Sequence, residues 1–102
     1  MSSMIDPEDC QTMTDVRAGV DSLDQQIVAL LATRFGFMRA AARIKQERGA
    51  VRDEARKAQV IANAKAEAVR LGVPPEVVGD LWERLVEGSI AYEFDRWDER
   101  SL

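Results

Sequence analysis

Apolar residues recur along the first half of the chain at alternating steps of four and three, which is the spacing of a coiled-coil seam. This seam consists of Val16, Val20, Leu23, Ile27, Leu30, Arg34, Phe37, Ala41 and Ile44. A second stripe beside it consists of Val28, Leu31, Phe35, Met38 and Ala42. Thr12 and Asp15 have the spacing of a capping box, and Gly49 is a typical helix stop. The pattern predicts one long helix over about residues 12–48, preceded by a short capped turn at residues 6–9.

The length of this helix bears on the assembly of the protein. At 1.5 Å per residue the helix is roughly 50 Å long, whereas a compact 100-residue domain has a radius of gyration of about 13 Å. Its wide apolar arc therefore needs cover from outside its own chain, and a second copy related by a two-fold axis is the simplest cover. We expect an obligate homodimer in which two long helices pair around the axis and the shorter helices wrap across them.

Two shorter helices are predicted after the long one. Asp53 is a suitable N-cap for a second helix over residues 53–71. The sequence Gly72-Val73-Pro74-Pro75 then ends that helix and starts a third, over residues 75–99. The inner stripe of the third helix consists of Val78, Trp82, Leu85, Val86, Ser89, Glu93 and Trp97. We expect a single all-α domain that spans residues 1–102.

Charge and hydropathy narrow the possible partners. The 102 residues include 14 Lys and Arg against 18 Asp and Glu, for a net charge of −4, so there is no broad positive field for nucleic acid or anionic lipid. No apolar run approaches the roughly 18 residues of a membrane span, and the N-terminus is acidic rather than a targeting segment. We expect no nucleic acid partner, no membrane partner and a cytoplasmic location.

The chain contains no histidine, which excludes histidine-dependent triads, histidine proton shuttles and His/Cys zinc sites built from this chain alone. Cys10 is the only cysteine, and we interpret it as a free thiol because no histidine could activate it. We expect neither a metal nor a cofactor.

Two cations, Arg34 on the seam of the long helix and Lys45 beside it, are here called the seam cations. Arg34 interrupts the seam, and Lys45 follows eleven residues later, which is three turns with almost no net rotation. Both cations should therefore share one face, roughly 16 Å apart along the axis. Met38 and Ala41 fall between them and would offer an apolar floor. A small anion with a carbon ring could lie there.

Further polar residues fall on buried faces or at helix starts. Ser89 and Glu93 are one turn apart on the inner stripe of the third helix, which places a hydroxyl beside a carboxyl. The alternative for Glu93 is a buried salt bridge to either of the two seam cations. Arg17 and Arg56, near the starts of the first two helices, could simply be solvated. Four cations and one acid at such positions together predict a site for a small dianionic acid.

In this order and spacing, the residues resemble those of the all-α chorismate mutase family. The residues that carry the resemblance are Val16-Arg17, Leu23-Asp24, Ile27 to Arg34, Ile44-Lys45, Val51-Arg52-Asp53, Arg56, Ser89 and Glu93. The resemblance covers nearly the whole chain. The opening Pro7-Glu8-Asp9-Cys10 and the ending Ile90 to Trp97 are more similar to the isochorismate-pyruvate lyase branch of the family.

The resemblance implies an intertwined homodimer with two equivalent sites. Arg17 would reach into the partner's site and bind a substrate carboxylate there. Arg34 would bind a carboxylate within its own chain, assisted by Arg56. Lys45 would donate to the ether oxygen and to a carboxylate. Ser89 would help to bind the ring carboxylate, and the backbone near Asp53 would contact the ring hydroxyl. Glu93 occupies a position where many relatives have glutamine.

The implied reaction suits this inventory of residues. Rearrangement of chorismate to prephenate is a concerted pericyclic step that needs no nucleophile, no metal and no general base. The enzyme has to hold the dianion in its reactive conformer and stabilise negative charge on the breaking C–O oxygen. Arginine forks suit the first task, while Lys45 and a protonated Glu93 suit the second.

Three functions are compatible with the sequence. Chorismate mutase leads, because the chain lacks a lyase-like glutamine at position 93. Isochorismate-pyruvate lyase, which forms salicylate and pyruvate with the same cations, is the closest alternative. A non-catalytic helical dimer is the second alternative, but it does not explain the inward-facing charges. Lys57 departs from the mutase pattern, since bacterial mutases often have a glutamate there for the ring hydroxyl, and its role is left open.

Overall fold

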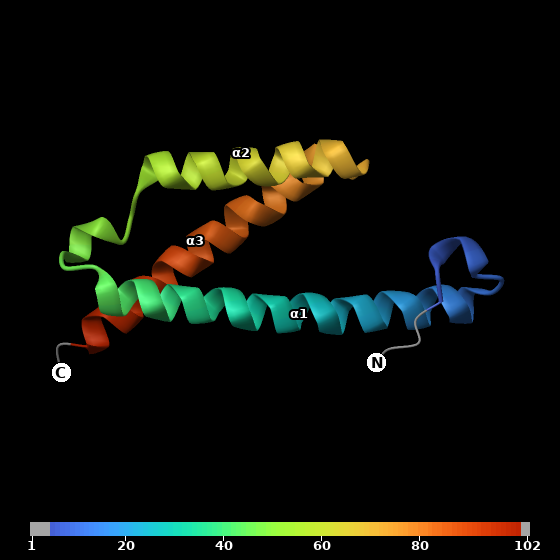
Figure 1. Ribbon diagram of the computed structural model, residues 1–102, viewed down its shortest axis with the longest axis horizontal. Coiled ribbons are helices and arrows are strands. Elements are labelled where there is room, and N and C mark those ends of the chain that lie inside the picture. Colours follow the sequence, from blue (N-terminus) through green and yellow to red (C-terminus); the bar gives the residue numbers. More distant parts are fainter. Residues whose placement is uncertain (1–4, 101–102) are drawn as a thin grey trace. The chain divides into compact units, whose positions relative to one another are not determined.

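The computed structural model describes residues 5–100, which are helical and contain no strand (Figure 1). The elements in chain order are a 3-10 turn η1 (Pro7–Asp9), helix α1 (Met13–Ile44), a 3-10 turn η2 (Arg48–Ala50), helix α2 (Glu54–Leu71) and helix α3 (Pro75–Glu99). With 32 residues, α1 is the longest of them. The predicted all-α class, with three helices and a very long first one, is therefore confirmed.

Helix α1 begins at the predicted capping box. The Asp15 N–H donates to Thr12 Oγ1 at 3.1 Å, and the Thr12 N–H donates to Asp15 Oδ2 at 3.3 Å. The Gln11 N–H also reaches Asp15 Oδ2, at 3.0 Å. The Asp15 carboxylate thus accepts from two donors that precede the helix, while Thr12 satisfies one of the first-turn N–H groups, which have no partner within the helix.

Helix α1 ends earlier than the sequence pattern predicts, at Ile44 rather than near Arg48. The Lys45 N–H still donates to Ala41 O at 2.9 Å. The Lys45 carbonyl, however, accepts from Trp97 Nε1 of α3 at 3.1 Å, where a continuing helix would use the N–H of the residue four positions later. A contact from a distant helix therefore determines where α1 ends, and the chain continues from there into the short turn η2.

Helices α2 and α3 form an antiparallel hairpin (Figure 1). Asp53 caps α2 as predicted, because its Oδ1 accepts from the Arg56 N–H at 3.0 Å. Gly72 ends α2 with φ = 76°, in the left-handed region, which side chains with a Cβ rarely adopt. The Val73 N–H closes the turn by donating to Ala68 O at 2.8 Å. Pro75 then begins α3.

The chain divides into two compact units, residues 1–36 and 37–102. The second unit has its own core, in which Val51, Val86 and Ile90 are buried. Side chains from α2 and α3 pack against them, namely Val60, Ile61, Trp82, Phe94 and Trp97. This core joins the connection after α1 to the hairpin of α2 and α3.

The described part of the first unit, residues 5–36, contains no buried side chain. The seam residues there are between 37% and 70% exposed in the single chain: Val16, Val20, Leu23, Ile27 and Leu30. An apolar stripe of this length is typical of a helix that packs against another surface. Within residues 5–100, no helix combines the length and the apolar character needed to cross a membrane.

Candidate functional site

An ion pair between Lys45 and Glu93 is the centre of the candidate site. Lys45 directly follows α1, and Glu93 lies in the interior of α3. The Lys45 Nζ is 2.7 Å from Glu93 Oε2, and the side chains are 30% and 5% exposed. One alternative that the sequence left open for Glu93, a salt bridge to a seam cation, is thus realised with Lys45. This ion pair brings an ammonium and a carboxylate, both able to interact with a ligand, into direct contact.

Ser89 adds a hydroxyl to the same face of α3. It lies one turn before Glu93, and both residues are buried, at 3% and 4% exposure. The Ser89 Oγ donates to Leu85 O at 2.7 Å, which is the back-bond that a serine inside a helix commonly forms. The Ser89 hydroxyl and the Glu93 carboxyl therefore both lie on the inner stripe of α3, one turn apart, as the sequence predicts.

Asp53 and Arg56 lie at the start of α2. The Asp53 carboxylate caps the helix, as described above. The Arg56 side chain is exposed and donates through Nη1 to Gln59 Oε1 at 2.7 Å. The structure therefore shows a capping role for Asp53 and a surface position for Arg56, and their roles toward a ligand stay predictions.

Arg17 and Arg34 both lie on α1, within the first compact unit. Arg17 is exposed. Arg34 is half-buried and engaged in an interaction with other groups. Their grouping with Lys45 and Glu93 also stays a prediction.

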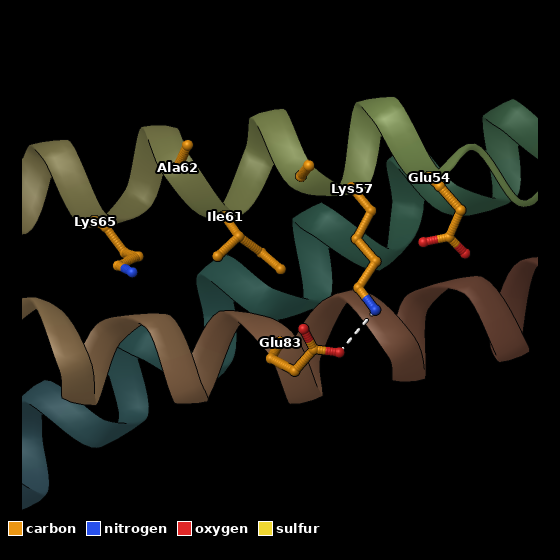
Figure 2. A pocket seen from close by; sticks show the side chains of 7 residues that line it. Glu54, Lys57, Ile61, Ala62, Lys65 and Glu83 are labelled. Carbon is orange, nitrogen blue, oxygen red and sulfur yellow. Dashed lines mark ion pairs between the residues drawn. The ribbon is translucent and has the colours of Figure 1, made fainter.

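Lys57 ties α2 to α3 (Figure 2). Its Nζ is 2.7 Å from Glu83 Oε2 and 2.6 Å from Glu87 Oε2, and its side chain is only 17% exposed. The role of Lys57 was open from the sequence, and these contacts were missed. The available signal was the i, i+4 spacing of Glu83 and Glu87, which places two carboxylates on one face of α3.

Arg52 extends this charge cluster. Its guanidinium binds the Glu87 carboxylate through two nitrogens, at 2.8 and 3.1 Å, and also reaches Glu54 Oε2 at 2.8 Å. The hydrogen bonds from Arg52, and then those from Lys57, lower the pKa of Glu87 to about 2. The hydrogen bonds of Lys57 to Glu83, and then to Glu87, raise the pKa of Lys57. Glu87 is therefore ionised throughout the physiological range.

An open hollow of about 390 Å³ lies beside Lys57, between α2 and α3 (Figure 2). It is lined by Glu54, Lys57, Ala58, Ile61, Ala62, Lys65 and Glu83. Figure 2 shows Lys57 extending from α2 toward Glu83 of α3. The ammonium is already held by two carboxylates, and neither Ser89 nor Glu93 lines this hollow. We therefore place the candidate site at the Lys45–Glu93 pair.

The described residues 5–100 contain no group of three or more Asp, Glu or Cys side chains arranged to hold a metal ion. The chemistry available at the Lys45–Glu93 pair is that of a donor cation, a buried carboxyl and a neighbouring hydroxyl. Such groups can bind an anion, exchange a proton and stabilise developing negative charge.

The sequence is similar to a known protein family and to two curated proteins. A family model described as chorismate mutase type II matches residues 16–94. An isochorismate pyruvate lyase of Pseudomonas aeruginosa is 29% identical over 91 residues, which cover 89% of this chain and 90% of that protein. A T-protein of Enterobacter agglomerans is 31% identical over 85 residues, which cover 82% of this chain but only 23% of that protein.

The lowered pKa of Glu87 predicts how the stability of the folded state changes in acid. A carboxylate whose pKa is depressed by folding stabilises the folded state above its unfolded pKa of about 4.3, and this contribution is lost as the pH falls toward the folded value. We expect Glu87→Gln to lower the urea midpoint at pH 7 and to flatten its decline between about pH 5 and about pH 2.

The matched control is Asp80→Asn, which changes an exposed acid on α3 that forms no ion pair within the described chain. This variant should retain the wild-type pH dependence of the urea midpoint. A Glu87→Gln profile parallel to that of the wild type would contradict the assignment.

Proposed function

The chain belongs to the chorismate mutase type II family, and from this premise we propose that it is a chorismate mutase that rearranges chorismate to prephenate. The observation that carries the proposal is the pairing of Lys45 with the buried Glu93, 2.7 Å apart. Replacing a buried ion pair by apolar residues is often neutral or stabilising. A pair of this kind in a small core is therefore better explained by a ligand than by stability.

In the proposed mechanism, Lys45 donates a hydrogen bond to the ether oxygen of chorismate as the C–O bond breaks. The electrons of that bond shift within the substrate while the new C–C bond forms, so the protein takes up no atom. Negative charge that develops on the oxygen is stabilised by the ammonium. Glu93 pairs with Lys45 as a carboxylate in the chain without substrate, and in the substrate complex it would have to carry a proton. The protonated form supplies a second donor, whereas an ionised carboxylate beside that oxygen would oppose the charge.

Binding of the two substrate carboxylates is assigned to arginines by the family resemblance. Arg34, with Arg56, would bind one carboxylate, and Arg17 of the partner chain would bind the other. Arginine grips a carboxylate through two parallel N–H groups, which fixes its orientation as well as its position. Ser89 would add a donor to the ring carboxylate, and the backbone near Asp53 would meet the ring hydroxyl. Orientation of the flexible dianion can account for several kcal/mol of the barrier.

The proposed assembly is a homodimer with two such sites. The support is the exposed seam of α1, in which Val20, Ile27 and Leu30 are 49%, 52% and 70% exposed in the single chain. Pairing of this seam with its copy would remove these side chains from water, and each buried methylene contributes about 0.8 kcal/mol. By the family resemblance, one chain's Arg17 would then reach the other chain's site.

Isochorismate-pyruvate lyase is the second candidate, favoured by the similarity to the Pseudomonas aeruginosa protein over 89% of this chain. The lyase reaction would use the same cations on the same ether oxygen, with transfer of a hydrogen within the substrate in place of C–C bond formation. Glu93 in place of glutamine favours the mutase.

A paired assay decides between these functions. The purified chain is given chorismate or isochorismate under identical conditions, and prephenate, salicylate and pyruvate are measured. We expect the higher kcat/KM with chorismate. A higher value with isochorismate would assign the chain as a lyase, and the lack of either activity would favour a non-catalytic helical dimer.

A second prediction concerns the proton on Glu93. We expect mutase activity to be higher at mildly acidic pH, because the protonated carboxyl is the form that can donate. Glu93→Gln supplies an amide donor at every pH, so this variant should have a flatter profile. If the variant keeps the wild-type pH dependence, Glu93 is not the group responsible.

A third prediction tests whether Arg17 acts across the dimer. Arg17→Ala and Arg34→Ala should each lose activity while remaining folded. After the two variants are unfolded and refolded together, a mixed dimer would contain one site with both arginines, and random pairing would restore about a quarter of the wild-type activity. Circular dichroism checks the folding of each variant. No recovery on mixing would contradict a site shared between chains.

A further inference from the structure

Two side chains at the C-terminal end of α3 bind the end of α1, one from Trp97 in the last turn and one from Arg100, which directly follows the helix. Trp97 Nε1 donates to the carbonyl oxygen of Lys45 at 3.1 Å. Arg100 Nη1 donates to the carbonyl oxygen of Ala42 at 2.7 Å and also to that of Lys45. The Arg100 guanidinium lies over the Trp97 ring, 4.7 Å from its centroid. The two donors therefore support each other as well as the end of α1.

These bonds satisfy groups that a helix end leaves open. The last four carbonyls of an α-helix have no main-chain partner within the helix, and a cation near that end is favourable for the helix dipole. Here the capping groups come from a different helix, more than fifty residues further along the chain. The end of α1 is thus fixed to α3 rather than left to fray.

Lys45 is consequently held at both ends by one helix. Its carbonyl is bound by Trp97 and Arg100, and its ammonium is bound by Glu93, one turn before Trp97. A lysine side chain has a flexible stem of four carbons, and fixing it costs about 2 kcal/mol in rotamer entropy. Fixing the backbone at Lys45 reduces the number of positions that the ammonium can reach.

We propose that Trp97 and Arg100 are positioning residues, which hold the backbone of Lys45 so that its ammonium stays at Glu93 and is ready for the substrate. This inference rests on the proposed function, in which Lys45 donates to the breaking ether bond. Neither Trp97 nor Arg100 is assigned a contact with the substrate, and both act through Lys45. Their loss should therefore affect the chemical step more than the binding of the substrate carboxylates.

The experiment compares Arg100→Ala and Trp97→Phe with the wild type in the full chain. Trp97→Phe keeps an aromatic ring but removes the N–H donor, and Arg100 is exposed, so both variants should fold. We expect kcat to fall roughly tenfold, since small displacements of a catalytic group have effects of this size or larger, with KM unchanged within about twofold. Arg100→Lys, which keeps a donor cation, should recover part of kcat.

The matched control is Arg96→Ala. Arg96 lies in the same last turn of α3, but it pairs with Glu99 and lies over the Tyr92 ring. This variant should retain the wild-type kcat. The urea midpoint of every variant shows whether a loss of activity reflects unfolding.

Hydrogen exchange of the Lys45 amide gives a readout that needs no activity. This amide donates to Ala41 O at 2.9 Å, and it should exchange faster in Arg100→Ala than in the wild type or in Arg96→Ala.

An active wild type with unchanged kcat in both test variants would overturn the inference, and so would an equal loss in Arg96→Ala or a change confined to KM. A wild type inactive on both chorismate and isochorismate would overturn the proposed function and the catalytic part of this inference together. Unchanged exchange of the Lys45 amide in Arg100→Ala would overturn the positioning itself, whatever the activity.

Discussion

Glu93 can lie at 4% exposure on the inner face of α3 because the Lys45 ammonium is 2.7 Å from its carboxylate. An unpaired charge at such a position would cost several kcal/mol. The pair therefore requires the end of α1 to lie against α3, and the bonds from Trp97 and Arg100 to the α1 carbonyls meet the same requirement. The connection from α1 to α2 starts from this fixed point, which also places Val51 in the core.

The features that could be predicted from the sequence are those set by neighbouring residues. Thr12 with Asp15, Asp53 with Arg56, and Gly72 with its positive φ each act over a few positions, and each limits a helix where the sequence predicts it. The end of α1 could not be predicted in this way. It depends on an indole and a guanidinium from the far end of the chain, whose reach is not visible in a hydrophobic pattern.

The same distinction applies to the candidate site. Lys45 and Glu93 stood out because a charge on an apolar stripe requires a partner, although the sequence left two cations open as the partner of Glu93. Lys57 gave no such signal, since a lysine at the start of a helix is ordinarily solvated, and only the fold shows Glu83 and Glu87 around it. Arg17 and Arg56 are exposed, so burial says nothing about their function, and their roles rest on the family resemblance.

The proposed reaction needs no nucleophile, metal or general base, so fixed charge would be the main means of accelerating it. Electrostatic catalysis depends on donors that are already oriented before the barrier is reached, because reorientation during the reaction would cost part of the stabilisation. A lysine on a free connection would meet this condition poorly. In the proposed mechanism, the contacts of Lys45 with Glu93 at the ammonium and with Trp97 at the carbonyl would turn a flexible side chain into a fixed donor. The residues that shape the end of α1 and those assigned to the proposed chemistry therefore belong to one arrangement, in which tertiary packing would supply the precision that the proposed reaction needs.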